Sequence, residues 1–154
     1  MGIFSGFLGL VFFKPQKVFA SSKASESSWS LSKEEWKSKL DLPVYQVLRE
    51  EATERPFSSD LNNEKRKGVF HCAGCDLPLF SSSAKFDSGT GWPSFWEPLP
   101  NAIQTKKDFK LIVPRIEYHC NRCGGHQGHV FNDGPRPTGK RYCNNGLALV
   151  FRPE

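Results

Sequence analysis

The spacing of hydrophobic and polar residues changes three times along the 154-residue chain. An uncharged apolar run over residues 3–13 comes first, and a stretch with six serines follows it at residues 21–30. Apolar residues then recur at helical spacing over residues 31–50, and further on they stand in short β-forming runs between turn-forming residues. The pattern predicts one folded domain over residues 31–154, preceded by a separate segment over residues 1–30.

The helical spacing predicts two short helices at the start of the domain. Ser32 and Glu35 have the spacing of a capping box, in which each side chain satisfies a backbone N–H of the other. Trp36 then lies on the apolar face of the first helix. Asp41 can cap a second helix, in which Pro43 takes an early position.

The residue pattern in the rest of the domain is typical of β-strands. The runs "VFHC" (69–72), "PLF" (78–80) and "LIVPRIEYHC" (111–120) favour strands, and "GLALVFR" (146–152) alternates apolar side chains with the period of a strand. We therefore predict a mainly β fold of two small antiparallel sheets with short N-terminal helices.

The apolar run near the N-terminus is typical of a targeting signal or a membrane anchor. It has eleven residues, which is too short to span a bilayer easily but fits the apolar core of a secretory signal. Val18 and Ala20 offer small residues for cleavage, yet no positive charge precedes the run. If residues 1–20 are a signal, the protein is exported or lies in an organelle or lumen. If they are a floppy tail, it is cytoplasmic.

The formal charge of +5 raises the question of nucleic acid. Only residues 65–67 and 106–107 are densely basic, and both stretches fall where turns are expected, so solvated loops explain them. We expect a monomer that does not bind nucleic acid.

Four of the five cysteines form two Cys-x-x-Cys units, Cys72/Cys75 and Cys120/Cys123. Two such units offer the tetrahedral set of four thiolates that structural zinc prefers. The metal would join two distant parts of one fold and leave no coordination position open for chemistry. A redox dithiol and two disulfides are the alternatives.

Cys143 stands apart from both pairs. Arg141 and Asn145 each lie two residues away, so an extended chain would point all three to one face, and a cation near a thiol favours the reactive thiolate. Titratable residues lie just upstream, namely His126, His129 and Asp133. The alternative is that Cys143 is a small buried hydrophobic residue.

Three stretches, "KFDSGTGWPSF" (85–95), "CGGHQGHVFNDGPRPTG" (123–139) and "RYCNNGLAL" (141–149), resemble the type B methionine sulfoxide reductases. The resemblance implies an enzyme that reduces methionine-(R)-sulfoxide in peptides and proteins, on a two-sheet fold with one structural zinc. Cys143 corresponds to the nucleophile, which becomes a sulfenic acid, and Trp92 to the residue that packs on the substrate methyl group. The surrounding catalytic positions correspond to His126, His129, Asp133, Arg141 and Asn145.

One position departs from many members of that family. They keep a second cysteine in the turn before the Gly-Trp pair, where this chain has Thr90. The resemblance therefore implies a single-cysteine form that depends on an external reductant: glutathione, a glutaredoxin or a thioredoxin-type protein. The alternative is a zinc-stabilised module that binds a protein partner without turnover.

Overall fold

The structure is a computed structural model that describes residue 2, residues 28–109 and residues 114–154. Strands β1 (Gly68–Cys72), β2 (Pro78–Ser81) and β9 (Leu149–Pro153) form an antiparallel sheet in the order β2-β1-β9. The second sheet is antiparallel and has six strands in the order β3-β4-β8-β7-β6-β5. In that order the strands are β3 (Lys85–Phe86), β4 (Ser94–Phe95), β8 (Arg141–Asn144), β7 (His126–Phe131), β6 (Arg115–Cys120) and β5 (Ile103–Asp108). The predicted mainly β fold with two antiparallel sheets is confirmed.

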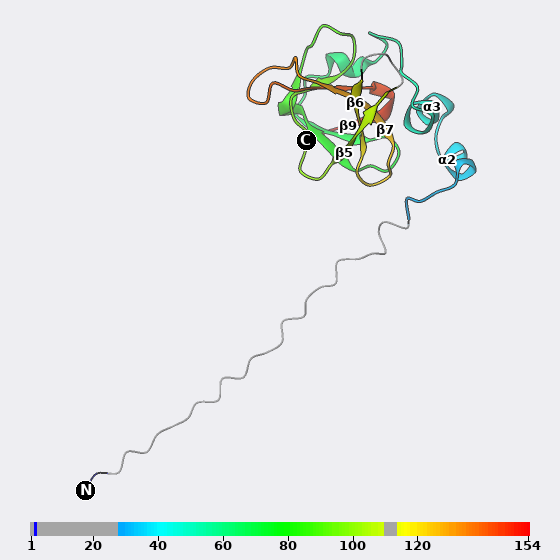
Figure 1. Cartoon of the computed structure of the whole chain (residues 1–154), viewed down its shortest axis with the longest axis horizontal. Coiled ribbons are helices and arrows are strands. Elements are labelled where there is room, and N and C mark those ends of the chain that lie inside the picture. The colour runs from blue at the N-terminus through cyan, green and yellow to red at the C-terminus, as the bar shows by residue number, and fades with distance from the viewer. Residues whose placement is uncertain (1, 3–27, 110–113) are drawn as a thin grey trace.

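Two helices, α2 (Lys33–Lys39) and α3 (Leu42–Glu50), lie beside the sheets (Figure 1). The predicted capping box is present, because the Ser32 hydroxyl accepts a hydrogen bond from the Glu35 N–H while the Glu35 carboxylate accepts one from the Ser32 N–H. Asp41 is the N-cap residue of α3, but its side chain makes no capping hydrogen bond. Within the described residues, neither helix approaches the length and apolar character needed to cross a membrane.

Three phenylalanine rings join the two sheets. Phe70 on β1 and Phe80 on β2 both pack against Phe95 on β4, with ring centroids 4.9 and 4.2 Å from that of Phe95, and all three side chains are fully buried. Burying aromatic side chains of this size supplies several kcal/mol, roughly 1.5–3 kcal/mol for each ring. The two sheets therefore share one core.

The six-stranded sheet sets five side chains in one row. Ser94 lies opposite Cys143, Cys143 opposite His129, His129 opposite Glu117, and Glu117 opposite Lys106. Directly opposed residues in antiparallel strands point to the same face of the sheet. The register alone therefore brings a thiol, an imidazole and a carboxylate to one face.

A bulge in β7 adds a second histidine to that face. Tyr118 on β6 pairs with Gly128, but the next residue, His119, pairs with His126, so Gln127 is the extra residue. Strict alternation would send residues 126 and 129 to opposite faces. With the bulge, the centroids of the two histidine rings lie 5.6 Å apart. Bulges often change the direction of a side chain beside an active site.

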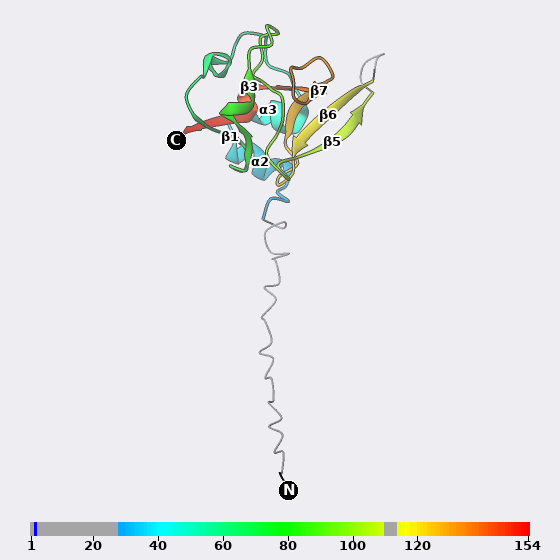
Figure 2. The same cartoon turned by 90° about the vertical axis from the view of Figure 1, so that its left-hand side faces the viewer.

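The start of β9 differs from the predicted pattern, and two stretches of that pattern lie outside the described residues. Residues 146–148 were predicted as strand, but they form a 3-10 helix that precedes β9. The N-terminal apolar run and most of the serine-rich stretch lie outside the described residues. Residues 110–113 also lie outside, between β5 and β6, the two strands that Figure 2 shows as a hairpin extending from the domain.

Gly128 on β7 lies close to the backbone of β8. A Cβ built on Gly128 would overlap the carbonyl oxygen of Cys143. We expect Gly128→Ala to force these strands apart and to lower stability by about 1–3 kcal/mol, as overpacking does. The control is Gly89→Ala, where a Cβ has open space and only a positive φ opposes it. Chemical denaturation of both variants is the test, and wild-type stability of Gly128→Ala would contradict the predicted clash.

Candidate active site and metal centre

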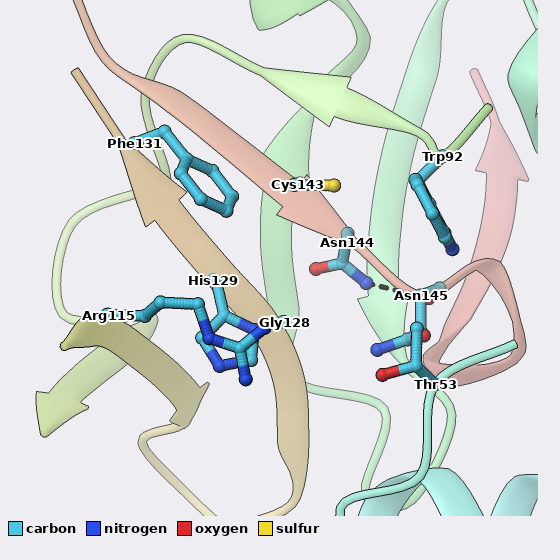
Figure 3. A pocket seen from close by; sticks show the side chains of 9 residues that line it. All are labelled: Thr53, Trp92, Arg115, Gly128, His129, Phe131, Cys143, Asn144 and Asn145. Carbon is cyan, nitrogen blue, oxygen red and sulfur yellow. Dashed lines mark hydrogen bonds between the residues drawn. The ribbon is translucent and has the colours of Figure 1, made fainter. Parts of the chain in front are cut away.

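Cys143 lies in a cavity of about 120 Å³. A cavity of this size suits one side chain better than a large ligand. Figure 3 shows Cys143 on β8 between the rings of Phe131 and Trp92. The other lining residues are Thr53, Arg115, Gly128, His129, Asn144 and Asn145.

The Cys143 thiol is only partly exposed, and burial raises its pKa. The positive charge of Arg141 and a hydrogen bond from the Thr90 hydroxyl lower the pKa without overcoming the burial. Arg141 thus favours the thiolate, as we expected, but the desolvation of the thiol is the larger effect. The thiol must lose its proton during any reaction in which it attacks.

Both histidines pair with buried carboxylates. His126 Nδ1 lies 2.8 Å from Glu117 Oε1, and His129 Nε2 lies 2.8 Å from Asp108 Oδ2. Burial lowers the pKa of His129, while the bond to Asp108 opposes that shift. His129 is consequently neutral near pH 7 and able to accept a proton.

Arg141 and Asp133 form a bidentate ion pair. The guanidinium Nε and Nη2 lie 2.9 and 2.8 Å from the two carboxylate oxygens of Asp133 and lower the pKa of that carboxyl. The Arg141 guanidinium also stacks on Phe131, with its Cζ 4.3 Å from the ring centroid. Among the described residues, Arg141, Asp133 and His126 are not in the cavity wall, whereas His129, Asn145 and Trp92 are.

Glu54 organises the other side of the cavity. Its carboxylate accepts hydrogen bonds from the N–H groups of Gly146 and Leu147, at 2.7 and 2.9 Å. Its carbonyl oxygen accepts one from Trp92 Nε1 at 3.2 Å, and its N–H donates to Asn145 Oδ1 at 3.1 Å. A single buried residue thus holds the indole and the amide that line the cavity.

The four paired cysteines come together as a possible metal site. All four sulfur atoms lie within 4.8 Å of one another, and the pairs Cys72–Cys123 and Cys75–Cys120 have Sγ–Sγ distances of 3.7 and 3.5 Å. A tetrahedral zinc with bonds of about 2.3 Å would separate its sulfurs by roughly 3.8 Å. The sulfur positions fit such an ion.

The two cysteine turns have the same backbone structure. The N–H groups of Asp76 and Gly124 donate to the carbonyl oxygens of Cys72 and Cys120, at 2.8 and 2.9 Å. Asp76 and Gly124 both adopt a left-handed conformation, with φ of 60° and 68°. The equivalent of Gly124 in the first turn is therefore Asp76, and not the glycine within the Cys-x-x-Cys unit.

Helix α3 and strand β7 tie the cysteine cluster to the rest of the domain. Leu48 on α3 covers both turns, and Arg49 Nη1 donates to the carbonyl oxygen of Cys123 at 2.9 Å. Gln127, the bulged residue, donates from Nε2 to Cys72 Sγ at 3.5 Å, while its carbonyl oxygen accepts from Asn145 Nδ2 at 3.0 Å. The bulge therefore links the metal site to the wall of the Cys143 cavity.

The fold and the two cysteine-based sites define a class of thiol-dependent enzyme stabilised by a distant four-cysteine cluster. The model of the SelR domain matches residues 40–153, so the chain belongs to that family. The chain is 50% identical to the chloroplastic peptide methionine sulfoxide reductase B1 of Arabidopsis thaliana over 137 residues, which cover 88% of this chain and 67% of that protein.

Two microbial relatives match over nearly their whole length. The peptide methionine sulfoxide reductase MsrB of Methanosarcina barkeri is 53% identical over 80% of this chain and 87% of its own. The MsrB of Pseudomonas entomophila is 54% identical over 79% of this chain and 93% of its own. The family resemblance that the motifs indicated is thereby confirmed.

Sequence reasoning missed several residues around the site. The buried carboxylates Glu54, Asp108 and Glu117 carry no local signature, because their partners are distant in sequence and meet them only through strand pairing. Phe131 and Arg115 were overlooked for the same reason. The one available signal was that Glu117 stands inside a β-forming run, where a carboxylate is unusual.

The cysteine cluster predicts a strong link between metal and stability. We expect Ser in place of Cys72, Cys75, Cys120 or Cys123 to remove the metal and to lower the melting temperature strongly. The free energy of binding in small zinc peptides, about 10–16 kcal/mol, is coupled to folding. Cys143→Ser is the matched control and should keep its metal. A full metal complement with unchanged melting in a cluster variant would contradict the assignment.

Proposed function

We propose that Cys143 is the nucleophile through which this chain acts as a peptide-methionine (R)-S-oxide reductase. The observation that carries the proposal is the position of Cys143 in a side-chain-sized cavity, directly opposite His129 and facing Trp92. The thiol can supply the two electrons, the imidazole can carry the proton, and the apolar ring can hold the methyl group of a methionine sulfoxide.

The atoms and electrons of the reduction balance without a cofactor. The thiol of Cys143 and a sulfoxide give a sulfenic acid on Cys143 and a thioether on the methionine. The cysteine sulfur loses two electrons, the methionine sulfur gains them, and the thiol proton ends on the sulfenic oxygen. Because burial raises the pKa of the thiol, His129 must take its proton as attack begins and then protonate the sulfoxide oxygen.

The shape of the cavity supports a preference for one epimer. The indole of Trp92 is held by the carbonyl oxygen of Glu54, so it offers a fixed apolar face to the S-methyl group, whose sulfur gains positive character during attack. The imidazole of His129 lies across the cavity from that ring, whereas the Asn145 amide lies on the same side as the ring. Only one configuration at sulfur puts the methyl group on the ring and the oxygen toward the imidazole.

The metal supports the site and takes no part in the reaction. We assign zinc to the four cysteines, because the spacing of four sulfurs suits its tetrahedral shell. Four protein ligands leave no position for substrate. Their role is to hold the turn after β6 and the bulge before His129, through the contact between Gln127 and Cys72.

Regeneration of Cys143 needs an outside thiol. Four of the five cysteines belong to the metal cluster, and Thr90 stands in the turn beside Cys143. The Thr90 hydroxyl hydrogen-bonds the Ser88 hydroxyl at 2.8 Å, which in turn bonds Ser94 at 2.8 Å, opposite Cys143. Glutathione, a glutaredoxin or a thioredoxin-type protein would therefore attack the sulfenic acid directly.

Cys143→Ser tests the proposed nucleophile. We expect loss of activity on the R epimer of a sulfoxide peptide, because a serine hydroxyl is a far weaker nucleophile at its ordinary pKa. The measurement is turnover of separate R and S epimers with dithiothreitol, on protein whose metal content and melting match the wild type. Substantial turnover of the R epimer by the folded variant would contradict the assignment of Cys143 as the nucleophile.

Thr90→Cys tests the proposed route of regeneration. Because the Thr90 hydroxyl is near enough to lower the pKa of the Cys143 thiol, the new cysteine should form a disulfide with Cys143 after one turnover and gain activity with thioredoxin. Thr90→Ser is the matched control, since it keeps the hydroxyl. The wild type should stop as a sulfenic acid that dimedone traps, so a stoichiometric intramolecular disulfide in the wild type would count against the single-cysteine route.

A further inference from the structure

The hairpin of β5 and β6 provides a carboxylate to each of the two histidines on β7. Glu117 on β6 meets His126 Nδ1, and Asp108 on β5 meets His129 Nε2, each at 2.8 Å. Both carboxylate side chains are 4% exposed. Two separate carboxylate–histidine pairs, bonded through different ring nitrogens, therefore lie side by side next to Cys143.

Each carboxylate also meets a cation, which favours its charged form. Arg115 Nη2 lies 2.7 Å from Asp108 Oδ2, and Lys106 Nζ lies 3.2 Å from Glu117 Oε2. Lys106 also pairs with Glu51 at 2.7 Å. Without such partners, burial would favour the neutral acids. The two close cations favour carboxylates that only accept hydrogen bonds.

Ionised carboxylates determine where the ring protons are. A neutral imidazole carries one proton, and the nitrogen that faces a carboxylate must carry it. The contact geometry thus favours a proton on Nδ1 of His126 and on Nε2 of His129. The remaining nitrogens, Nε2 of His126 and Nδ1 of His129, are free bases. His126 Nε2 is buried and has no hydrogen-bond partner among the described residues.

We propose that Glu117 and Asp108 are positioning residues for the reduction of the sulfoxide, which hold His126 and His129 in opposite tautomers and stabilise the imidazolium that forms when His129 takes the Cys143 proton. The inference rests on the proposed function of Cys143. His129 lies directly opposite Cys143, and the His126 ring is 5.6 Å from the His129 ring. The proton leaves the Cys143 sulfur, resides on imidazole, and ends on the oxygen of the sulfenic acid.

Glu117→Gln separates the charge of the carboxylate from its shape. The glutamine amide can accept a hydrogen bond from one imidazole tautomer or donate one to the other, so it no longer determines which ring nitrogen is protonated. As a neutral group it also does not stabilise an imidazolium. We expect the single-turnover rate constant for the R-sulfoxide peptide to fall by about 100-fold, within the range of acid–base catalysis. The peptide concentration that gives half of the maximal rate should change little. Glu117→Asp keeps the charge and should recover part of the rate. Asp108→Asn should act in the same way through His129.

The ring tautomers supply a readout that does not depend on turnover. In ¹⁵N NMR, protonated and bare imidazole nitrogens have well-separated chemical shifts. The wild type should show His126 protonated on Nδ1 and His129 on Nε2, and Glu117→Gln should populate both tautomers of His126 while leaving His129 unchanged. The control is Glu34→Gln, which alters an exposed carboxylate on α2 and should change neither rates nor tautomers.

The two readouts separate the possible failures. If the wild type does not reduce the R-sulfoxide, the proposed function fails, whatever the tautomers are. If the wild type reduces it and a folded, metal-replete Glu117→Gln protein is as fast in single turnover, the positioning role of Glu117 is overturned. A wild-type spectrum with His126 protonated on Nε2 would overturn the assignment of tautomers in the same way.

Discussion

The register of the six-stranded sheet is the constraint on which the rest of the site depends. Pairing of β4, β8, β7 and β6 places Ser94, Cys143, His129 and Glu117 in one row on one face. A slip of one residue between β7 and β8 would turn His129 away from Cys143, because side chains alternate between faces. Gly128 protects this register, since only a glycine lets the two strands approach closely beside Cys143.

The bulge at Gln127 serves both sites in the protein. It moves His126 to the face of His129, and it directs the Gln127 side chain to Cys72 while the Gln127 carbonyl oxygen binds Asn145. The cysteine cluster joins the ends of β1 and β6, which belong to different sheets. Metal bound there would stabilise the backbone on both sides of the histidines, which explains how a site outside the cavity supports chemistry inside it.

Local signals in the sequence predicted what local contacts determine. The capping box at Ser32, the helical face of Trp36 and the four-cysteine cluster all depend on short spacings or on a donor set typical of metals. Glu54, Asp108 and Glu117 could not be predicted in this way, since each acts on a residue that only the folded sheet brings near. The pKa of Cys143 was also beyond local reasoning, because a neighbouring arginine is visible in the sequence and the burial that outweighs it is not.

The central claim is that Cys143 takes up the oxidising equivalents of a methionine-(R)-sulfoxide in a single step without another cysteine. Mass spectrometry of the metal-replete protein after one turnover without any thiol tests it most directly. With the R epimer and not the S epimer, we expect one methionine per protein molecule and one added oxygen, located on the peptide that contains Cys143. An unmodified Cys143 after stoichiometric formation of methionine, or oxidation confined to the cluster cysteines, would contradict it.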